Sequence, residues 1–239
     1  MGTKDEGHAV MSGEGTIAVD RALALLQAFR PGDGALTLAE LANRTGLNKS
    51  TILRLAVSLQ RANLLVKLPV GGFRLGGQLL SLAAIFRESL HLDREVRPRL
   101  VALAAEAGES ASFYLVEGNM RICVVRVEAD QAVRDAAPLA QASPLTTDET
   151  ATGLVLRRLP GRNVGAVDGP FAPIFTSGLR IAETASVSAP ILGGGSTFIG
   201  ALTLSGPAFR LTADSASVLA PLLAKSAAEL SAIFGWAPQ

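Results

Sequence analysis

Apolar residues recur at helical spacing in three stretches near the N-terminus. The first stretch is expected to bury a face made of Val19, Ala22, Leu23 and Leu26. The second helix is expected to begin at Thr37, since Glu40 completes a capping box, and to end at Gly46, which suits a left-handed C-cap. The third helix is expected to run from its N-cap, Asn48, to about Ala62.

A short alternating segment follows these helices. Residues 64–75 alternate between apolar and polar around Gly71-Gly72, which predicts a β-hairpin. Three helices and a hairpin make a winged helix-turn-helix, expected over residues 16–76. Residues 77–91 are expected to form a linker helix with an apolar stripe made of Leu79, Leu82, Ala83 and Phe86. That stripe suits either the pairing of two protomers or packing against the chain's own domains.

The remaining residues, 92–239, change between helical and strand periodicity. Helices are expected over residues 93–108, 148–159 and 212–234. Strands are expected over residues 110–116, 120–127, 131–139, 186–192 and 197–205, with a turn at the three glycines 193–195. Strands joined by hairpins and placed between helices predict an α+β sandwich rather than a parallel α/β fold.

Charged residues are distributed unevenly along the chain. The whole sequence has a net charge of only +1. Residues 16–75 contain eight Lys or Arg against three Asp or Glu, an excess of five positive charges that leaves −4 for the rest. A basic module therefore precedes a mildly acidic one, and the basic module favours a negatively charged partner such as nucleic acid.

The third predicted helix has two faces of different chemistry. Its aliphatic residues gather on one side and its hydroxyl and guanidinium groups on the other. In a helix-turn-helix the polar side lies in the major groove, where Arg54 suits a guanine edge and Lys49 a phosphate near the helix N-terminus. Arg74 on the hairpin, with Lys67 across from it, suits the sugar–phosphate backbone. The predicted DNA-contacting residues are Arg44, Asn48, Lys49, Ser50, Thr51, Arg54, Ser58, Arg61, Lys67 and Arg74.

An ordinary solvated helix would carry similar side chains, but the basic excess and the adjoining hairpin favour DNA. The segments "LTLAELANRTGLNKSTILRLAVSLQRANLL", "GGFRLGGQLLSLA" and "SVSAPILGGGSTFIGALTLSGPAFRLT" resemble the IclR-type transcriptional regulators. The resemblance covers most of the chain. It implies a winged helix-turn-helix joined by a helix to a C-terminal GAF-like α/β sandwich of the effector-binding type. It also implies a homodimer or a dimer of dimers on double-stranded operator DNA.

The same resemblance implies that the C-terminal domain binds a small-molecule effector, often an organic acid or an aromatic compound. The positions that match the family's pocket are Pro144, Leu145, Thr150, Ala151, Gly153, Ser188 and Ala189. Phe113 and Tyr114 are adjacent in a strand and face opposite sides, so one is expected in the core and the other in the pocket. Cys123 is a further candidate, and a buried structural cysteine is favoured over a redox sensor.

The chain departs from the family pattern at the entrance to this pocket. Thr146 replaces a histidine that is usual in the family, and Asp148 and Glu149 look inserted. Leu154 replaces a lysine that usually follows the helix glycine. Two added carboxylates and a lost lysine disfavour an anionic ligand. A neutral effector and a degenerate domain that binds no effector are both compatible with these residues.

Residue counts weigh against several other classes. With one cysteine there is no internal disulfide, and two histidines, His8 and His91, offer little to a zinc centre or a histidine-based triad. No cofactor or metal is therefore expected. No apolar run approaches the ~20 residues that span a bilayer, so a cytoplasmic protein is expected, with residues 1–15 as a disordered tail. An enzyme with an accessory DNA-binding module is the competing hypothesis, although no nucleophile and base occur at a recognisable spacing.

Overall fold

The structure, a computed structural model, describes residues 15–135, 142–145, 148–158 and 168–237. The chain divides into two compact units between Phe86 and Arg87, and each unit is described by itself. This division falls inside helix α4 (Gln78–Ser89), within the segment predicted as a linker. The tail predicted for residues 1–15 lies, except for Gly15, outside the described residues.

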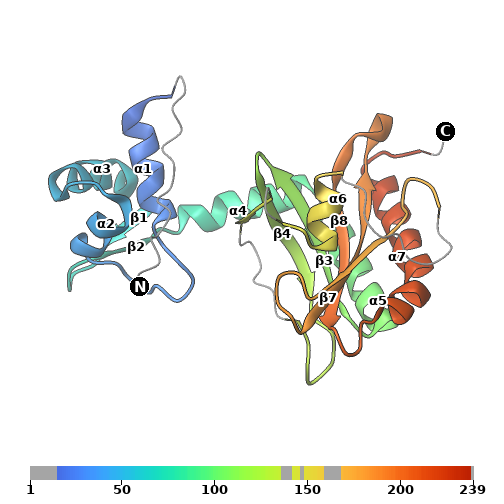
Figure 1. Cartoon of the computed structure of the whole chain (residues 1–239). Helices are drawn as coiled ribbons and strands as arrows, with labels where there is room; N and C mark the ends of the chain where they lie inside the picture. Colours follow the sequence, from blue (N-terminus) through green and yellow to red (C-terminus); the bar gives the residue numbers. More distant parts are fainter. Residues whose placement is uncertain (1–14, 136–141, 146–147, 159–167, 238–239) are drawn as a thin grey trace. The chain divides into compact units, whose positions relative to one another are not determined.

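The first unit consists of three helices, a two-stranded antiparallel hairpin and the start of α4 (Figure 1). The helices are α1 (Ile17–Gln27), α2 (Leu38–Thr45) and α3 (Lys49–Arg61), and the strands are β1 (Leu65–Lys67) and β2 (Phe73–Leu75). We call the β1–β2 hairpin the wing. This is the predicted winged helix-turn-helix.

Local hydrogen bonds fix the ends of α2 and α3 where the sequence predicts them. The Thr37 hydroxyl accepts from the Glu40 amide and the Glu40 carboxylate accepts from the Thr37 amide, which is a complete capping box. Gly46 adopts the left-handed conformation with φ +70° and ends α2. The side-chain oxygen Oδ1 of Asn48 then accepts from the Thr51 amide at 2.9 Å and caps the start of α3.

Helix α1 buries part of the face that its sequence predicts, Ala22 and Leu26, together with Leu25 in place of Val19 and Leu23. Leu25 is fully buried, and Ala22, Leu26 and Phe29 pack partly buried beside it in the core of the first unit. The predicted face also included two exposed residues, Val19 and Leu23, which are 53% and 48% exposed. Because α1 is apolar on most of its circumference, one helical spacing fits two alternative faces. The surrounding helices select between them.

The second unit is built on a six-stranded antiparallel sheet of order β5-β4-β3-β8-β7-β6. Its strands are β3 (Ser110–Glu117), β4 (Met120–Val127), β5 (Ala142–Pro144), β6 (Ile174–Ser177), β7 (Thr184–Leu192) and β8 (Phe198–Pro207). Its helices are α5 (Arg97–Ala107), α6 (Ala151–Leu156) and α7 (Ala213–Ile233), with a π-helical turn η1 (Leu92–Val96) before α5 and a 3-10 turn η2 (Gly194–Ser196) between β7 and β8.

Helices cover both faces of this sheet (Figure 1). Helices α5 and α7 pack on one face, in a core that includes Leu100, Phe113 and Leu223. Helix α6 packs on the other face, in a smaller cluster with Tyr114 and Val155. The second unit is therefore the α/β sandwich that the sequence predicts, and the whole chain is of mixed α+β class.

Helix α7 is long and apolar enough, by length and hydropathy, to cross a membrane, and it is the one such helix among the described residues. Its Leu223, Ala227 and Leu230 are buried against the sheet. This burial identifies α7 as a core helix.

Two predicted elements differ from the structure. In the extended stretch predicted at 131–139, residues 131–133 form bends and residues 134–135 are irregular, and a strand occurs instead at β5; residues 136–141 lie outside the described residues. The helix predicted at 148–159 begins only at Ala151, because the Asp148 carboxylate accepts from both the amide and the hydroxyl of Thr150. These local hydrogen bonds keep the backbone of residues 148–150 out of the helix, and Thr150 then serves as the N-cap of α6.

Candidate nucleic-acid interface and ligand pocket

Helix α3 presents different faces to the core and to the solvent. Ile52, Ala56 and Leu59 are buried in the core of the first unit. On the rest of the helix surface Thr51 is half-buried, and the exposed predicted residues are Lys49, Ser50, Arg54, Ser58 and Arg61. The predicted burial of the aliphatic stripe is confirmed, and of the predicted polar residues all but Thr51 are exposed. We call the exposed side the outer face of α3.

The cations on this outer face have no ion-pair partner among the residues that the structure describes. Lys49, Arg54 and Arg61 form no ion pair with a carboxylate of the described residues. Twelve residues of helix separate the first of them from the last, a length of about 18 Å. Unpaired positive charges along such a length hold counterions, and a polyanion that replaces those counterions gains free energy from their release.

Two residues predicted to contact DNA are engaged inside the first unit. Arg44 donates to the Ala28 carbonyl at 2.9 Å and pairs with the Asp33 carboxylate, so it ties α2 to the segment after α1. The hydrogen bond from Arg44 to the Asp33 carboxylate holds the pKa of Asp33 below its usual value. The side-chain oxygen of Asn48 is taken up by the cap of α3. Both residues therefore position the helix-turn-helix.

The wing carries one exposed cation on each strand. Lys67 lies opposite Phe73 and Arg74 lies opposite Val66. Since successive residues of a strand face opposite sides, Lys67 and Arg74 are on opposite faces of the hairpin rather than across from each other. The sequence prediction of a facing pair is corrected by this register.

Sequence reasoning missed two aliphatic residues on the outer face of α3. Leu53 and Val57 are 44% and 48% exposed, and neither belongs to the core cluster of the first unit. They are one turn apart, so their side chains are neighbours on the helix surface. A residue-by-residue projection of the helix would have found them, because Val57 projects beside Arg61 and Leu53 beside Val57, both away from the buried stripe.

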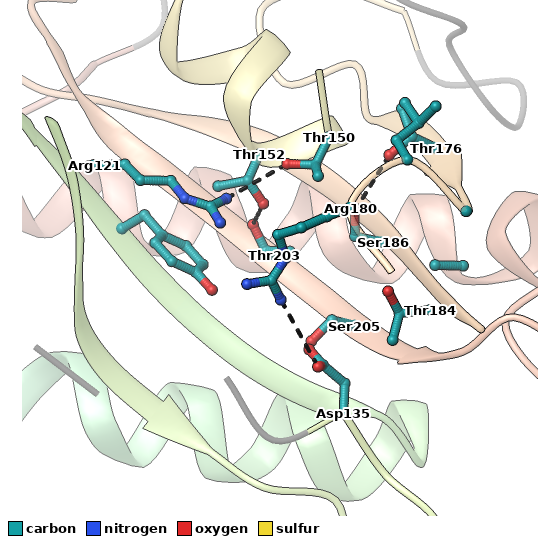
Figure 2. Close-up of a pocket in the computed structure, with 14 residues that line it drawn as sticks. Arg121, Asp135, Thr150, Thr152, Thr176, Arg180, Thr184, Ser186, Thr203 and Ser205 are labelled. Atoms are coloured by element: carbon teal, nitrogen blue, oxygen red, sulfur yellow. Dashed lines mark hydrogen bonds and ion pairs between the residues drawn. The ribbon is translucent and has the colours of Figure 1, made fainter. Parts of the chain in front are cut away.

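A small pocket with a cavity volume of about 30 Å³ lies in the second unit on the α6 face of the sheet (Figure 2). Eight hydroxyl-bearing side chains line it, those of Tyr114, Thr150, Thr152, Thr176, Thr184, Ser186, Thr203 and Ser205. Arg121, Asp135 and Arg180 are its charged lining residues. That volume is well below the roughly 300–1,000 Å³ of typical small-molecule sites, and the lining is more polar than is usual for one.

Each charged group of the pocket has a partner of opposite charge. Arg121 lies 2.7 Å from the Asp148 carboxylate, and both side chains are less than a tenth exposed. The Asp135 carboxylate pairs with the guanidinium of Arg126 at 3.5 Å. The guanidinium of Arg180 points towards the same carboxylate at 4.0 Å (Figure 2). No group in this set stands as an isolated buried charge, which would be costly.

Tyr114 and Cys123 are uncharged parts of this region. Burial raises the pKa of Tyr114 to about 12, so its hydroxyl remains a hydrogen-bond donor at neutral pH. Burial also raises the pKa of the Cys123 thiol, which is 2% exposed and donates to the Val125 carbonyl at 3.6 Å. A buried thiol of raised pKa is unreactive, which agrees with the structural interpretation of Cys123.

The structure brings only part of the predicted effector set to the pocket. Tyr114 and Thr150 line it, and Ser188 supports it through hydrogen bonds at 3.2 and 2.8 Å to Thr152 and Thr203. Four other candidates, Cys123, Leu145, Ala151 and Gly153, are buried beside or in α6 without lining the pocket, and Pro144 is exposed. At Gly153 an added Cβ would lie 2.2 Å from the Asp148 carbonyl oxygen, so packing requires the glycine.

Two predicted effector residues face away from the pocket. Phe113 and Ala189 are fully buried in the core under α5 and α7, where the Phe113 ring lies 5.9 Å from that of Phe234. Phe113 is adjacent to Tyr114 and Ala189 is adjacent to Ser188. Because successive residues of a strand point to opposite faces of the sheet, Phe113 and Ala189 face the core while their neighbours face the pocket side.

The sequence does contain a signal for the lining residues that it failed to predict. Hydroxyl residues alternate with apolar ones at Thr184, Ser186 and Ser188 on β7 and again at Thr203 and Ser205 on β8. These two strands pair, with Ser186 opposite Ser205 and Ser188 opposite Thr203. Alternation in both strands therefore marks a polar face of the sheet.

The departures at the pocket entrance have less electrostatic effect than the sequence suggested. Asp148 is neutralised by Arg121, and Glu149 is exposed to solvent. Leu154 is partly buried beside the α6 cluster, and Thr146 lies outside the described residues. The entrance therefore carries no unpaired buried acid among the residues that the structure describes.

Comparison with known proteins identifies relatives of this chain. Residues 18–69 match the family model of the IclR helix-turn-helix domain. The chain is 32% identical over 182 residues to the HTH-type transcriptional regulator TtgV of Pseudomonas putida, covering 74% of this chain and 67% of that protein. The fold matches an IclR transcriptional regulator from Alicyclobacillus acidocaldarius with a TM-score of 0.74 at 20% identity, over 92% of this chain and 100% of the other.

A second solved structure contains a small molecule. It is an IclR homologue from Microbacterium hydrocarbonoxydans in complex with 4-hydroxybenzoate, with a TM-score of 0.67 at 19% identity. The match covers 90% of this chain and 98% of that one. At this identity the likeness shows a shared fold.

Proposed function

The chain belongs to the IclR family of transcriptional regulators, which bind DNA through a helix-turn-helix, and we propose that its outer face of α3 reads operator DNA from the major groove. The observation that carries the proposal is the set of cations Lys49, Arg54 and Arg61, which form no ion pair with a described residue, on a helix whose Ile52, Ala56 and Leu59 are buried in the core. A helix anchored in this way presents its polar side rigidly to a groove.

The predicted contacts divide by chemistry. Arg54 donates two hydrogen bonds to a guanine edge, and Ser50 and Ser58 reach neighbouring bases or phosphates. Lys49, near the amino end of α3, binds a phosphate that the helix N-terminus also attracts. Lys67 and Arg74 on the wing hold the sugar–phosphate backbone. Arg61 and Thr51 contact the DNA at the edges of the interface. Arg44 and Asn48 act as positioning residues.

Selection of bound sites from genomic DNA by the full chain tests this proposal, because it requires no prior operator. Enrichment of a two-fold symmetric motif is expected, and Arg54→Ala should abolish the enrichment while Arg94→Ala, an exposed arginine of the second unit, leaves it intact. Failure of the wild type to enrich any motif would reject the assignment of α3.

Two-fold symmetry of the site follows from the second part of the proposal, a homodimer or a dimer of dimers. Its support is the exposed apolar surface of two helices. No residue of α4 is buried, and its exposed apolar side chains are those of Leu80, Leu82, Ile85 and Phe86. Helix α1 adds Ile17, Val19 and Leu23. Surfaces of this kind are typical of sites where proteins pair.

The third part of the proposal concerns the pocket, which takes a small, uncharged, hydrogen-bonding effector. Its support is a lining of hydroxyls in which each guanidinium and carboxylate is already paired (Figure 2). A charged ligand would have to break one of those pairs, whereas a neutral one gains hydrogen bonds without doing so. We further propose that this regulator works in the cytoplasm, where its DNA lies, and that these residues bind an effector and do not catalyse a reaction.

A thermal-shift screen distinguishes this effector from the alternative of a ligand-free domain that serves only oligomerisation. A ligand at 100 times its dissociation constant stabilises the protein by about 2.7 kcal/mol. Neutral polyols, amides and phenols are expected to include such a ligand, and its effect should be lost in Thr203→Val. If no neutral compound stabilises the chain, the ligand-free alternative holds.

A further inference from the structure

The outer face of α3 combines cations with an unburied aliphatic pair. Leu53 and Val57 expose nearly half of their surfaces to solvent. The buried side of the same helix is complete without them, since Ile52, Ala56 and Leu59 fill the core of the first unit. Nothing in the packing of this unit accounts for aliphatic residues at these two positions.

The helix geometry places Val57 among the proposed DNA contacts. At 100° per residue, Val57 points about 60° from Arg54 and about 40° from Arg61. Leu53, one turn earlier, lies beside Val57 on the side away from Arg54. Val57 therefore lies next to the centre of the outer face, and Leu53 lies towards its edge.

The major groove contains an apolar partner for such a side chain. Thymine presents a C5-methyl group there, and apolar side chains recognise that methyl by contact. Valine suits this use because its branched Cβ leaves one strongly preferred rotamer in a helix, so the methyls are held in place before binding. The neighbouring cations bring the DNA to this surface, so the surface favours a nucleic acid over an apolar protein partner.

We propose that Val57, supported by Leu53, reads the C5-methyl group of a thymine beside the base pair that Arg54 reads. This inference rests on the proposed function of α3 and adds a specificity-determining residue to it. Three residues of helix separate Arg54 from Val57, about 4.5 Å along the axis. Base pairs are about 3.4 Å apart, so the thymine lies one or two base steps from the guanine.

Replacement of thymine by deoxyuridine tests the contact, because it removes only the methyl group. Sites selected by the wild-type chain are resynthesised with deoxyuridine at one position at a time, and the dissociation constants are measured by fluorescence anisotropy. Loss of one buried methyl is expected to weaken wild-type binding about fourfold at one thymine in each half-site. Val57→Ala should bind the thymine and deoxyuridine sites equally well. Val218→Ala, which truncates an exposed valine on α7, should keep the fourfold difference.

The outcomes separate this inference from the function on which it rests. If no motif is selected, the proposed function of α3 fails. If a motif is selected but every deoxyuridine site binds as well as its thymine parent, only the thymine contact is wrong. Persistence of the fourfold difference in both Val57→Ala and Leu53→Ala would also overturn it. A fall in oligomeric mass of Val57→Ala, measured by light scattering, would assign the pair to a contact between copies of the chain instead.

Discussion

Arg121 and Asp148 form one of the two buried ion pairs at the pocket, and Asp148→Asn is the substitution that tests it. Asp148 Oδ1 accepts two hydrogen bonds from Thr150, and Oδ2 has no hydrogen bond but lies 2.7 Å from Arg121. Asparagine keeps the shape and the bonds to Thr150. The substitution replaces Oδ2 with an NH₂ group that faces the Arg121 guanidinium. Arg121 then meets the positive end of an amide dipole in place of the negative carboxylate.

The size of the effect follows from the burial and the distance. The two side chains are 8% and 7% exposed. At 2.7 Å and an effective dielectric constant of about 20, the attraction is about 6 kcal/mol. Desolvation of both ions offsets much of it, and removal of one partner from a buried pair costs about 3–5 kcal/mol. We expect Asp148→Asn to lower the free energy of unfolding of the second unit by about 3 kcal/mol.

The single tryptophan makes this measurable in the full chain. Trp236 packs edge-on against Phe171 with ring centroids 4.8 Å apart, so its fluorescence reports on the second unit. Urea unfolding followed at this residue gives the free energy of unfolding from the midpoint and the slope. Glu149→Gln, at the exposed neighbouring acid, is the matched control and should change stability by less than about 0.5 kcal/mol. Equal midpoints for Asp148→Asn and Glu149→Gln would refute the reasoning.

Three further predictions concern the first unit and its assembly. Arg54→Ala should weaken specific operator binding about 5- to 150-fold with little change in non-specific binding, whereas Lys67→Ala should weaken both and reduce the slope of log K against log salt by about 0.9, as measured by anisotropy titrations. Because its pairing with Arg44 holds the pKa of Asp33 low, that pair stabilises the first unit above the unfolded pKa, and the stability is lost as the pH falls through the folded pKa. Asp33→Asn should therefore flatten the acid limb of the stability profile, and an unchanged profile would count against the pair. Leu80→Glu on α4 should shift the chain to a lower oligomeric mass in light scattering, and Val218→Glu on α7 should not.

Local signals explain what could be predicted from the sequence. The ends of α2 and α3 depend on caps within three residues of the helix, at Thr37, Gly46 and Asn48, and each cap is visible in the sequence. The aliphatic stripe of α3 is also local, because Ile52 and Ala56 repeat at helical spacing. Such features do not depend on the rest of the chain.

Contacts between elements distant in the sequence explain the features that the sequence did not predict. Arg44 and Arg54 look alike in the sequence, but Asp33 and the Ala28 carbonyl lie beside the first of them in the fold. The burial of Leu25 instead of Leu23 on α1 is likewise set by the helices around it. In the second unit, the pocket is assembled from paired strands whose register no local pattern specifies.

The central claim is that the outer face of α3 lies in a major groove with Arg54 on a guanine edge. Methylation interference tests it most directly, since dimethyl sulfate places a methyl on guanine N7, the acceptor that Arg54 would use. On a selected site, methylation of one guanine in each half-site should abolish wild-type binding and leave the weaker binding of Arg54→Ala unchanged. Wild-type binding that tolerates N7 methylation at every guanine would contradict the account.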